Sequence, residues 1–362
     1  MFLMLCLALS TSLRSEFLVS SFSGNQVFRY HETTGAFIDV FIPNTNGLLS
    51  LPHGLAFGPD NHLYVTSAGN DRILRYDGTT GAFIDTFISN GSGGLNYPVT
   101  LIFHDDGLLY ISSQLSGEVL RYNGTNGAFV DVFVSANPAL DGPSDMVFGP
   151  DGNLYVVGRF NNQVARYQGA TGALIDVFVS DNLLQPFGLR FLPGGDLLVV
   201  SGNQNSVQRF NGSTGQYIET FNIAGGLSFP VGIVYGPDAN LYVASFSNNK
   251  VGRFDAANGS FLGDFVTGGS GGLNGPNFML FRSSPVAVDP PWLGIDRTGA
   301  NVELFWATNA AEFHLQSTEA LFTNSMWNVV TNRVVVSGES NVVTLPIAEG
   351  GRFFRLMNPH PL

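Results

Sequence analysis

The chain has 362 residues, more than one ordinary domain requires, and 12% of them are charged. Its formal net charge is −12 and Lys250 is its single lysine, so the clustered cations that a phosphate backbone requires are missing. Nucleic acid is therefore excluded as an expected partner. Polarity comes mainly from Gly, Asn, Ser and Thr, a composition that favours strands and turns over helices.

Residues 1–15 contain an apolar run that includes the one cysteine, Cys6, and passes into small residues. This pattern resembles the end of a secretory signal peptide without its basic region; a disordered or strand-forming terminus is the alternative. We expect export to the periplasm or the extracellular space, and a mature chain without a disulfide framework. No later apolar stretch reaches the ~20 residues that a membrane-spanning helix requires.

Residues 16–283 consist of six copies of one unit. Each copy is marked by an arginine followed by an aromatic residue, and successive arginines lie 46, 46, 45, 43 and 44 residues apart. The six pairs are Arg29-Tyr30, Arg75-Tyr76, Arg121-Tyr122, Arg166-Tyr167, Arg209-Phe210 and Arg253-Phe254. This spacing is the period of a four-stranded propeller blade.

Each copy divides into four segments of strand length. In the second copy these are residues 54–57, 63–67, 73–76 and 82–87, separated by turn sequences such as Gly58-Pro59-Asp60-Asn61 and Thr80-Gly81. The first two segments are apolar with little alternation, which indicates burial on both faces, whereas the last alternates. The first strand should therefore lie nearest the axis and the fourth at the rim.

The first copy lacks its first strand, and the missing strand follows the last copy at residues 277–281. One C-terminal strand and three N-terminal strands would complete a single blade, which removes the exposed sheet edges of an open stack. Six copies closed in this way predict an all-β, six-bladed propeller of four-stranded blades.

The repeat stops near Ser283. Residues 284–291 read as a Pro-rich linker, and residues 292–362 contain all three tryptophans in short alternating runs. Short strands separated by polar turns predict a small β-sandwich. This pattern resembles the fibronectin-like modules at the C-termini of many secreted bacterial repeat proteins.

The unit seen at residues 52–76 and 143–167, P-x-G-L-x-F-G-P-D-G-x-L-Y-V followed by N-x-V-x-R-Y, resembles the NHL-type repeat of six-bladed propellers. That resemblance implies the superfamily of streptogramin lyases, gluconolactonase-like metalloenzymes and peptidyl-hydroxyglycine lyases, which also includes non-enzymatic binding proteins. The enzymes place a divalent ion or a His-containing acid/base set at the axial mouth. The sequence shows no such set.

Residues that recur in every copy are best explained by the scaffold. The anchor arginines and the acidic residues of the fourth strand (Asp39, Asp85, Asp131, Asp176 and Glu219) should therefore form structural cross-strand pairs. The recurrent polar residues Asn25, Asp71, Asn162, Asn205 and Asn249 are interpreted as turn formers rather than calcium ligands. His62, His104, Asp105 and Asp106 should lie on the surface at the opposite face.

Functional residues should instead break the repeat, on the face where the loops between strands two and three meet those between strand four and the next blade. The predicted ligand-binding residues there are Phe22, His53, Gln114, Asp145, Arg159, Phe160, Phe187, Phe246 and Asn277. His53 and Asp145 are also the candidate catalytic pair, although a metal site or acid/base centre usually needs more convergent groups. Arg190 sits in an apolar strand, and Asp145 of the neighbouring blade is its expected partner.

Two functional hypotheses follow. The first is a secreted, monomeric, non-enzymatic propeller without a cofactor, which presents its loop-rich face to an extracellular ligand such as a glycan, a peptide or an envelope component. The alternative is a lyase or lactone hydrolase of the streptogramin-lyase or gluconolactonase type, with a divalent cation at the mouth and His53 and Asp145 as ligands or acid/base groups. A third possibility is a spacer that has no ligand.

Overall fold

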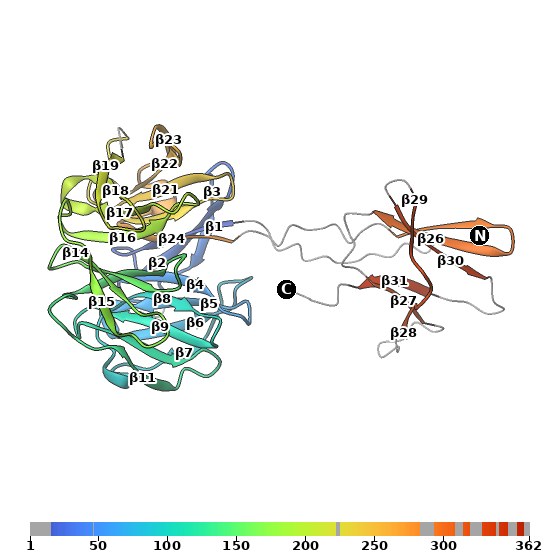
Figure 1. Cartoon of the computed structure of the whole chain (residues 1–362), viewed down its shortest axis with the longest axis horizontal. Coiled ribbons are helices and arrows are strands. Elements are labelled where there is room, and N and C mark those ends of the chain that lie inside the picture. Colours follow the sequence, from blue (N-terminus) through green and yellow to red (C-terminus); the bar gives the residue numbers. More distant parts are fainter. Residues whose placement is uncertain are drawn as a thin grey trace. The chain divides into compact units, whose positions relative to one another are not determined.

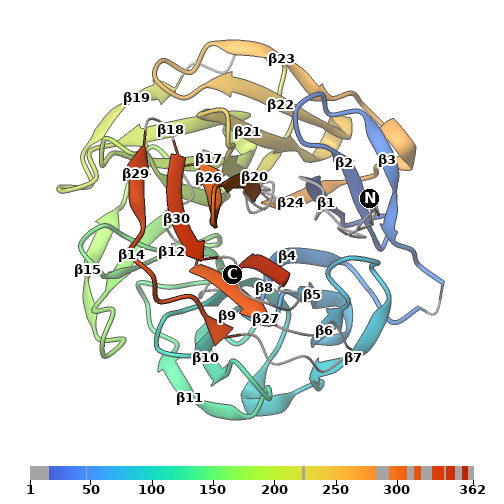
Figure 2. The same ribbon diagram turned by 90° about the vertical axis from the view of Figure 1, so that its right-hand side faces the viewer.

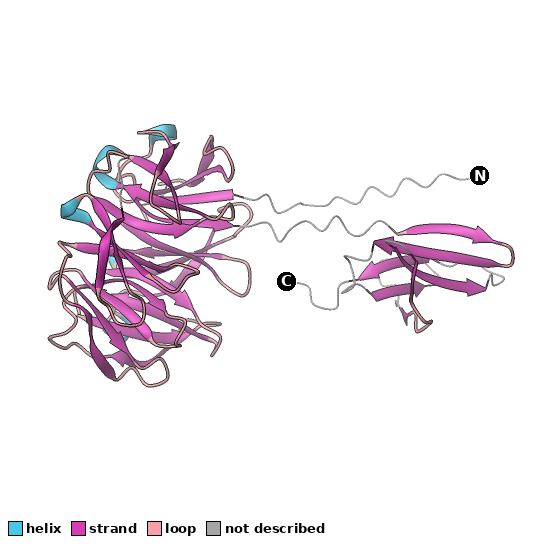
Figure 3. Cartoon of the chain, turned by 45° about the horizontal axis from the view of Figure 1, so that its top comes forward, coloured by secondary structure: helices cyan, strands magenta, loops and turns pink. Residues whose placement is uncertain are grey.

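A computed structural model describes residues 16–45, 47–221, 225–282, 293–307, 314–318, 328–337, 340–346 and 353–357. The signal-peptide-like segment and the predicted linker lie outside these residues. The chain forms two compact units, one built by residues 15–283 and the other containing residues 284–362 (Figure 1). Strands make up almost all of the regular structure, as Figure 3 shows.

The first unit is a propeller of six four-stranded antiparallel sheets around a common axis (Figure 2). In blade order, the innermost strands are β24 (Pro276–Arg282), β4 (Pro52–Phe57), β8 (Pro98–Phe103), β12 (Pro143–Phe148), β16 (Pro186–Phe191) and β20 (Pro230–Tyr235). The second strands are β1 (Glu16–Ser21), β5 (Leu63–Ser67), β9 (Leu108–Ser113), β13 (Leu154–Gly158), β17 (Leu197–Ser201) and β21 (Asn240–Ser245).

The two outer layers complete each blade. The third strands are β2 (Gln26–His31), β6 (Arg72–Tyr76), β10 (Glu118–Asn123), β14 (Gln163–Tyr167), β18 (Ser206–Phe210) and β22 (Lys250–Asp255). The rim strands are β3 (Phe37–Ile42), β7 (Phe83–Ile88), β11 (Phe129–Val134), β15 (Leu174–Val179), β19 (Tyr217–Phe221) and β23 (Phe261–Val266). The predicted division of each repeat into four strands, from axis to rim, is confirmed.

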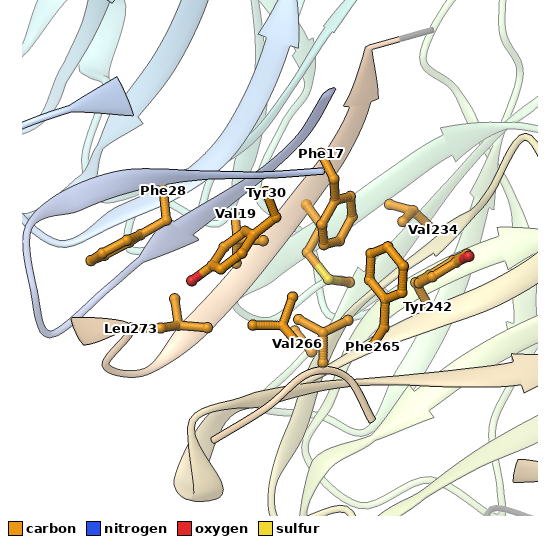
Figure 4. Close-up of a cluster of buried hydrophobic side chains, with 12 residues drawn as sticks. Phe17, Val19, Phe28, Tyr30, Val234, Tyr242, Phe265, Val266 and Leu273 are labelled. Atoms are coloured by element: carbon orange, nitrogen blue, oxygen red, sulfur yellow. The ribbon is translucent and has the colours of Figure 1, made fainter. Parts of the chain in front are cut away.

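The ring closes as the sequence predicted. β24 pairs antiparallel with β1, so blade 1 combines one strand from the end of the repeat region with three from its start. A buried apolar cluster joins this blade to blade 6, and Figure 4 shows Phe17 of blade 1 next to Tyr242 and Phe265. Because such clusters lie between neighbouring blades, each blade depends on the next for its core.

The outer half of the propeller repeats one ion pair. The anchor arginine of the third strand faces an acidic residue of the rim strand, as in Arg121 and Asp131, whose Nη2 and Oδ2 atoms are 2.6 Å apart. The same arginine lies over a rim-strand phenylalanine, with Cζ of Arg121 at 4.7 Å from the Phe133 ring centre. Blade 6 departs from this pattern because Gly263 stands opposite Arg253. The predicted cross-strand pairing is confirmed in the other five blades.

The inner strands approach one another closely around the axis. Gly54 and Gly188 occupy the third position of their strands, and a Cβ atom there would lie 2.6 Å from the carbonyl oxygens of Val99 and Val231 respectively. Such distances are below van der Waals contact, so these positions require glycine. Thr100, Asp145 and Phe278 replace glycine at the equivalent positions.

The second unit contains two sheets, and is described by itself. One is ordered β25 (Gly294–Thr298), β26 (Asn301–Ala307), β30 (Ser340–Pro346) and β29 (Val335–Ser337); the other is ordered β28 (Asn328–Val329), β27 (His314–Thr318) and β31 (Phe353–Met357). Trp306, Leu304 and Val343 of the first sheet form a buried cluster with Leu315 of the second. This arrangement confirms the predicted β-sandwich, and adds strand β25, which the sequence reading missed.

Candidate functional site

A recurrent backbone feature builds the loop-rich face. The residue before each inner-strand proline has a positive φ, and four of these residues are not glycine: Leu51, Tyr97, Gln185 and Phe229. This conformation is uncommon for large side chains and needs support from its surroundings. The support is a side-chain hydrogen bond from the preceding blade, as in Gln185 N–H to Oδ1 of Asn162 at 2.7 Å.

We call this bond the latch. The latch recurs at four other junctions. There the backbone N–H groups of Leu51, Tyr97, Phe229 and Gly275 donate to the side-chain Oδ1 atoms of Asn25, Asp71, Asn205 and Asn249, respectively. The polar residues that the sequence predicted as turn formers therefore also tie one blade to the next. Gly117 and Gly142 stand at the corresponding positions between blades 3 and 4, so that junction has no side-chain latch.

Most of the predicted ligand-binding residues come together on this face. Phe22 lies between His53 and Phe246, with ring centres at 5.0 and 5.7 Å. On the other side, Cζ of Arg159 lies 4.0 Å from the Phe187 ring centre and 5.6 Å from that of Phe160. The predicted residues thus form two groups, one around blades 1, 2 and 6 and one around blades 4 and 5.

Two residues that the sequence reading missed extend these groups. Phe229 joins them, because its ring centre is 5.7 Å from that of Phe187 and 6.2 Å from that of Phe246. Tyr97 continues the series beyond His53 at 5.5 Å. Both precede an inner-strand proline, and that position was the signal available in the sequence. We call the continuous set the mouth ring: Tyr97, His53, Phe22, Phe246, Phe229, Phe187, Arg159 and Phe160.

His53 is a buried member of the mouth ring. Its Nδ1 atom lies 2.8 Å from Nδ2 of Asn277, and its Nε2 atom lies 3.5 Å from the Tyr97 hydroxyl. Burial lowers the pKa of His53 to about 3, and the nearby Arg159 guanidinium acts in the same direction. The imidazole is therefore neutral, with both ring nitrogens next to hydrogen-bonding groups.

Asp145 lies apart from the mouth ring and is completely buried. Its carboxylate accepts hydrogen bonds from the Thr100 hydroxyl, the Met146 and Leu189 N–H groups, and Nη1 of Arg190 at 2.9 Å. The predicted pairing with Arg190 is confirmed. Burial raises the pKa of Asp145, while the arginine and the three other donors oppose that shift. This carboxylate links the inner strands of three blades and has no exposed surface for a ligand.

Gln114 and Asn277 are also buried, and each has an unpartnered polar atom: Nε2 of Gln114 and Oδ1 of Asn277. The Gln114 N–H bonds the Tyr97 carbonyl, as the Phe22 N–H bonds that of Gly275. Gln114 therefore has the same position in blade 3 as Phe22 has in blade 1. It occupies the interval of the mouth ring between Arg159 of blade 4 and Tyr97.

A cavity of about 390 Å³ lies among the inner strands. Most of its lining is apolar, including Leu101, Met146 and Met279, and Arg190 and His104 add polar groups. His104, which the sequence predicted at the surface, has a side chain that is 35% exposed, and its ring centre lies 4.3 Å from that of Phe148. The stacking on Phe148 explains this partial burial.

The chain belongs to the virginiamycin B lyase family, whose model matches residues 9–254. This membership confirms the resemblance to streptogramin lyases inferred from the repeat. A search of curated proteins found none that matches. No helix in the described ranges is long and apolar enough to cross a membrane.

Solved structures support the fold. The chain is similar to one in a crystal structure of a nidogen/laminin complex, with 20% identity and a TM-score of 0.62 over 75% of this chain and 99% of the other. It resembles a protein of unknown function from Bacteroides caccae, with 15% identity and a TM-score of 0.57 over 74% and 98%. It also resembles a gluconolactonase from Xanthomonas campestris, with 21% identity and a TM-score of 0.51 over 64% and 79%.

The mouth residues do not fit the divalent ion that the enzymes of this superfamily imply. Among the residues that the structure describes, no three His, Cys, Asp or Glu side chains gather closely enough to hold a metal ion. Asp145 is occupied by four donors, and His53 has Asn277 and Tyr97 at its nitrogens. A catalytic metal usually requires three protein ligands, so we derive no reaction step through one.

Proposed function

We propose that this chain is a non-catalytic member of the virginiamycin B lyase family, which binds an extracellular ligand through the mouth ring. The observation that carries this proposal is the composition of the mouth ring. It has seven aromatic side chains, counting His53, together with one arginine. Among the described residues, no group of three acidic, His or Cys side chains gathers there. Aromatic rings with a few polar groups are typical of recognition surfaces. The ligand is a glycan, a peptide or an envelope component.

The competing proposal is a lyase or lactone hydrolase, and family membership is the observation that favours it. Such an enzyme would need an acid/base group at the mouth. His53 is the nearest candidate, but its low pKa and its position between Asn277 and Tyr97 suit a neutral structural imidazole better. Burial of Asp145 removes the second candidate from the reacting surface.

Glycan and peptide arrays probed with the whole chain test the proposal. A double variant, Phe22→Ala with Phe246→Ala, should lower the affinity for any array ligand at least tenfold, since aromatic anchors dominate recognition sites. The matched control is Phe37→Ala with Phe83→Ala, which removes two partly exposed phenylalanines from rim strands β3 and β7. Equal binding by both double variants would refute the role of the mouth ring.

A parallel assay addresses the enzymatic alternative. The chain is incubated with streptogramin and lactone substrates in the presence of Mg²⁺, Mn²⁺, Ca²⁺ or Zn²⁺. Turnover that disappears in His53→Ala would overturn the non-catalytic assignment.

We also propose that the protein is exported. The support is the apolar start of the sequence and the low charge, together with the single Cys and single Lys. Fractionation of the producing cell should place the chain outside the cytoplasm, in a form shortened near residue 15. A full-length cytoplasmic product would contradict export.

A further inference from the structure

Arg159 is a cation without an anionic partner. No carboxylate lies within ion-pair distance of its guanidinium in the described part of the chain, whereas most of the anchor arginines are paired with acids. Its Nε atom is buried and makes no hydrogen bond. Burial lowers the pKa of Arg159 from its ordinary value, which expresses the cost of holding this charge away from water.

Aromatic contacts fix the position of this guanidinium. Its Cζ atom lies 4.0 Å from the ring centre of Phe187, which is itself buried, and 5.6 Å from that of Phe160. Stacking on a ring engages the flat face of a guanidinium and leaves the N–H donors at its edge for another group. Arg159 is thus held in place with its donors uncommitted.

Gln114 provides a second, independent donor. Its side chain is 4% exposed and its buried Nε2 atom has no partner. Gln114 and Arg159 occupy the same position in neighbouring blades, since the N–H of each bonds the carbonyl of the residue just before the inner-strand proline of its own blade. Phe22 and Phe246 hold this position in blades 1 and 6, where their ring centres are 5.7 Å apart. Gln114 and Arg159 therefore stand at equivalent points of the mouth, on adjacent blades.

These donors stand beside an apolar arc. From Phe187 the mouth ring continues through Phe229, Phe246 and Phe22 with ring centres 5.7 to 6.2 Å apart. A buried donor without a partner is costly, and a ligand that supplies an acceptor removes that cost. Guanidinium and amide N–H groups together match the two oxygens of a carboxylate.

Resting on the binding function proposed above, we infer that the mouth ring recognises a carboxylate attached to an apolar or aromatic body. Arg159 and Gln114 donate to the carboxylate, and the Phe187–Phe229–Phe246 arc contacts the body. The carboxylate of Asp71, in the blade before Tyr97, is already engaged, since its Oδ1 accepts the Tyr97 N–H.

The first experiment is calorimetric titration of the full chain with phenylacetate and with phenylacetamide, which has the same body without the charge. We expect saturable binding of phenylacetate, at least tenfold weaker binding of the amide, and weaker binding of the acid as salt is raised. Arg159→Met should abolish the preference for the acid, and Arg159→Lys should restore part of it. The control Arg253→Met removes one positive charge from strand β22 and should leave binding unchanged.

Thermal melts separate loss of binding from loss of folding. Because Arg159 has a buried, unsatisfied donor, Arg159→Met should melt no lower than the wild type; a large fall would indicate a structural role and overturn the inference. Gln114→Leu should weaken phenylacetate binding without lowering the melting temperature. Equal affinity for acid and amide would also overturn the inference.

Two further binding comparisons show whether the carboxylate belongs to a peptide or to a sugar. One compares an aromatic-ended peptide with its C-terminal amide, and the other compares a uronic-acid oligosaccharide with its neutral reduced form. If no acid is preferred but a neutral array ligand still binds through Phe22 and Phe246, the carboxylate inference fails while the proposed binding function stands. If neither acids nor array ligands bind, both fail.

Discussion

The rim and the axial mouth of the propeller use the same repeat in opposite ways. At the rim, the ion pair between the third and fourth strands is nearly invariant, as with Arg75 and Asp85. Near the axis, equivalent positions hold different residues, such as Gly54, Thr100 and Asp145. The rim pairs are half-exposed and replaceable, whereas Asp145 is buried and bonded to several strands. Repetition therefore marks the scaffold, but variation near the axis does not by itself mark function.

The largest effect should come from removing Asp145. Asp145→Ala leaves the Arg190 charge and the Leu189 N–H without their acceptor, and breaking one side of a buried ion pair costs ~3–5 kcal/mol. Urea denaturation of the propeller should report this loss. Asp85→Ala, the matched rim variant, should cost at most ~1 kcal/mol because its pair is half-exposed. Similar losses for the two variants would remove the distinction between rim and axis.

The next largest effect should be a loss of folding stability at acid pH, caused by the buried His53. Its folded pKa of about 3 lies below the ordinary value, so as the pH falls from 6.5 toward 3 the unfolded chain takes up a proton that the folded chain does not. Folding stability is then lost with falling pH, at up to ~1.4 kcal/mol per pH unit from this one group. Urea melts at pH 7, 5.5 and 4 should show a shallower pH dependence for His53→Gln than for the wild type. Parallel dependences would contradict the buried neutral imidazole.

Adding a methyl group between the closely packed inner strands should destabilise the propeller somewhat less. In Gly188→Ala the new Cβ would lie 2.6 Å from the Val231 carbonyl oxygen, and overpacking of this kind costs ~1–3 kcal/mol. Gly194 is the matched control, since a Cβ there meets no atom within 4 Å. The midpoint of thermal unfolding should fall for Gly188→Ala and stay near that of the wild type for Gly194→Ala. An unchanged midpoint for Gly188→Ala would mean that the strands can separate without cost.

Much of this propeller is predictable from the sequence because each copy repeats the same information. Strand order, ring closure and the pairing of Arg190 with Asp145 all follow from periodicity and from the cost of burying an unpaired charge. The place of Asp145 away from the mouth ring did not follow, because its distance from the surface depends on how closely neighbouring strands approach. Tyr97 and Phe229 were missed for a related reason. Their side chains reach the mouth ring because their backbone has a positive φ, and that conformation cannot be predicted from a tyrosine or a phenylalanine.

The latch should give the smallest effect that is still measurable. Asn162→Gly keeps a residue that tolerates positive φ but removes the acceptor of the Gln185 N–H, and one such hydrogen bond contributes ~1 kcal/mol. Asn182→Gly is its control: Asn182 has the same φ of 57° and lies in the loop before Gln185, but within the described part of the chain its side chain makes no hydrogen bond to a neighbouring blade.

Denaturation should therefore show a loss for Asn162→Gly that Asn182→Gly does not share. The junction of blades 3 and 4 already lacks a latch, so the ring as a whole tolerates one missing bond. Hydrogen exchange should accordingly confine the change to the Gln185 loop and strand β16, which carries Phe187 of the mouth ring. Exchange that rose equally in all six blades would show instead that the latch stabilises the propeller globally.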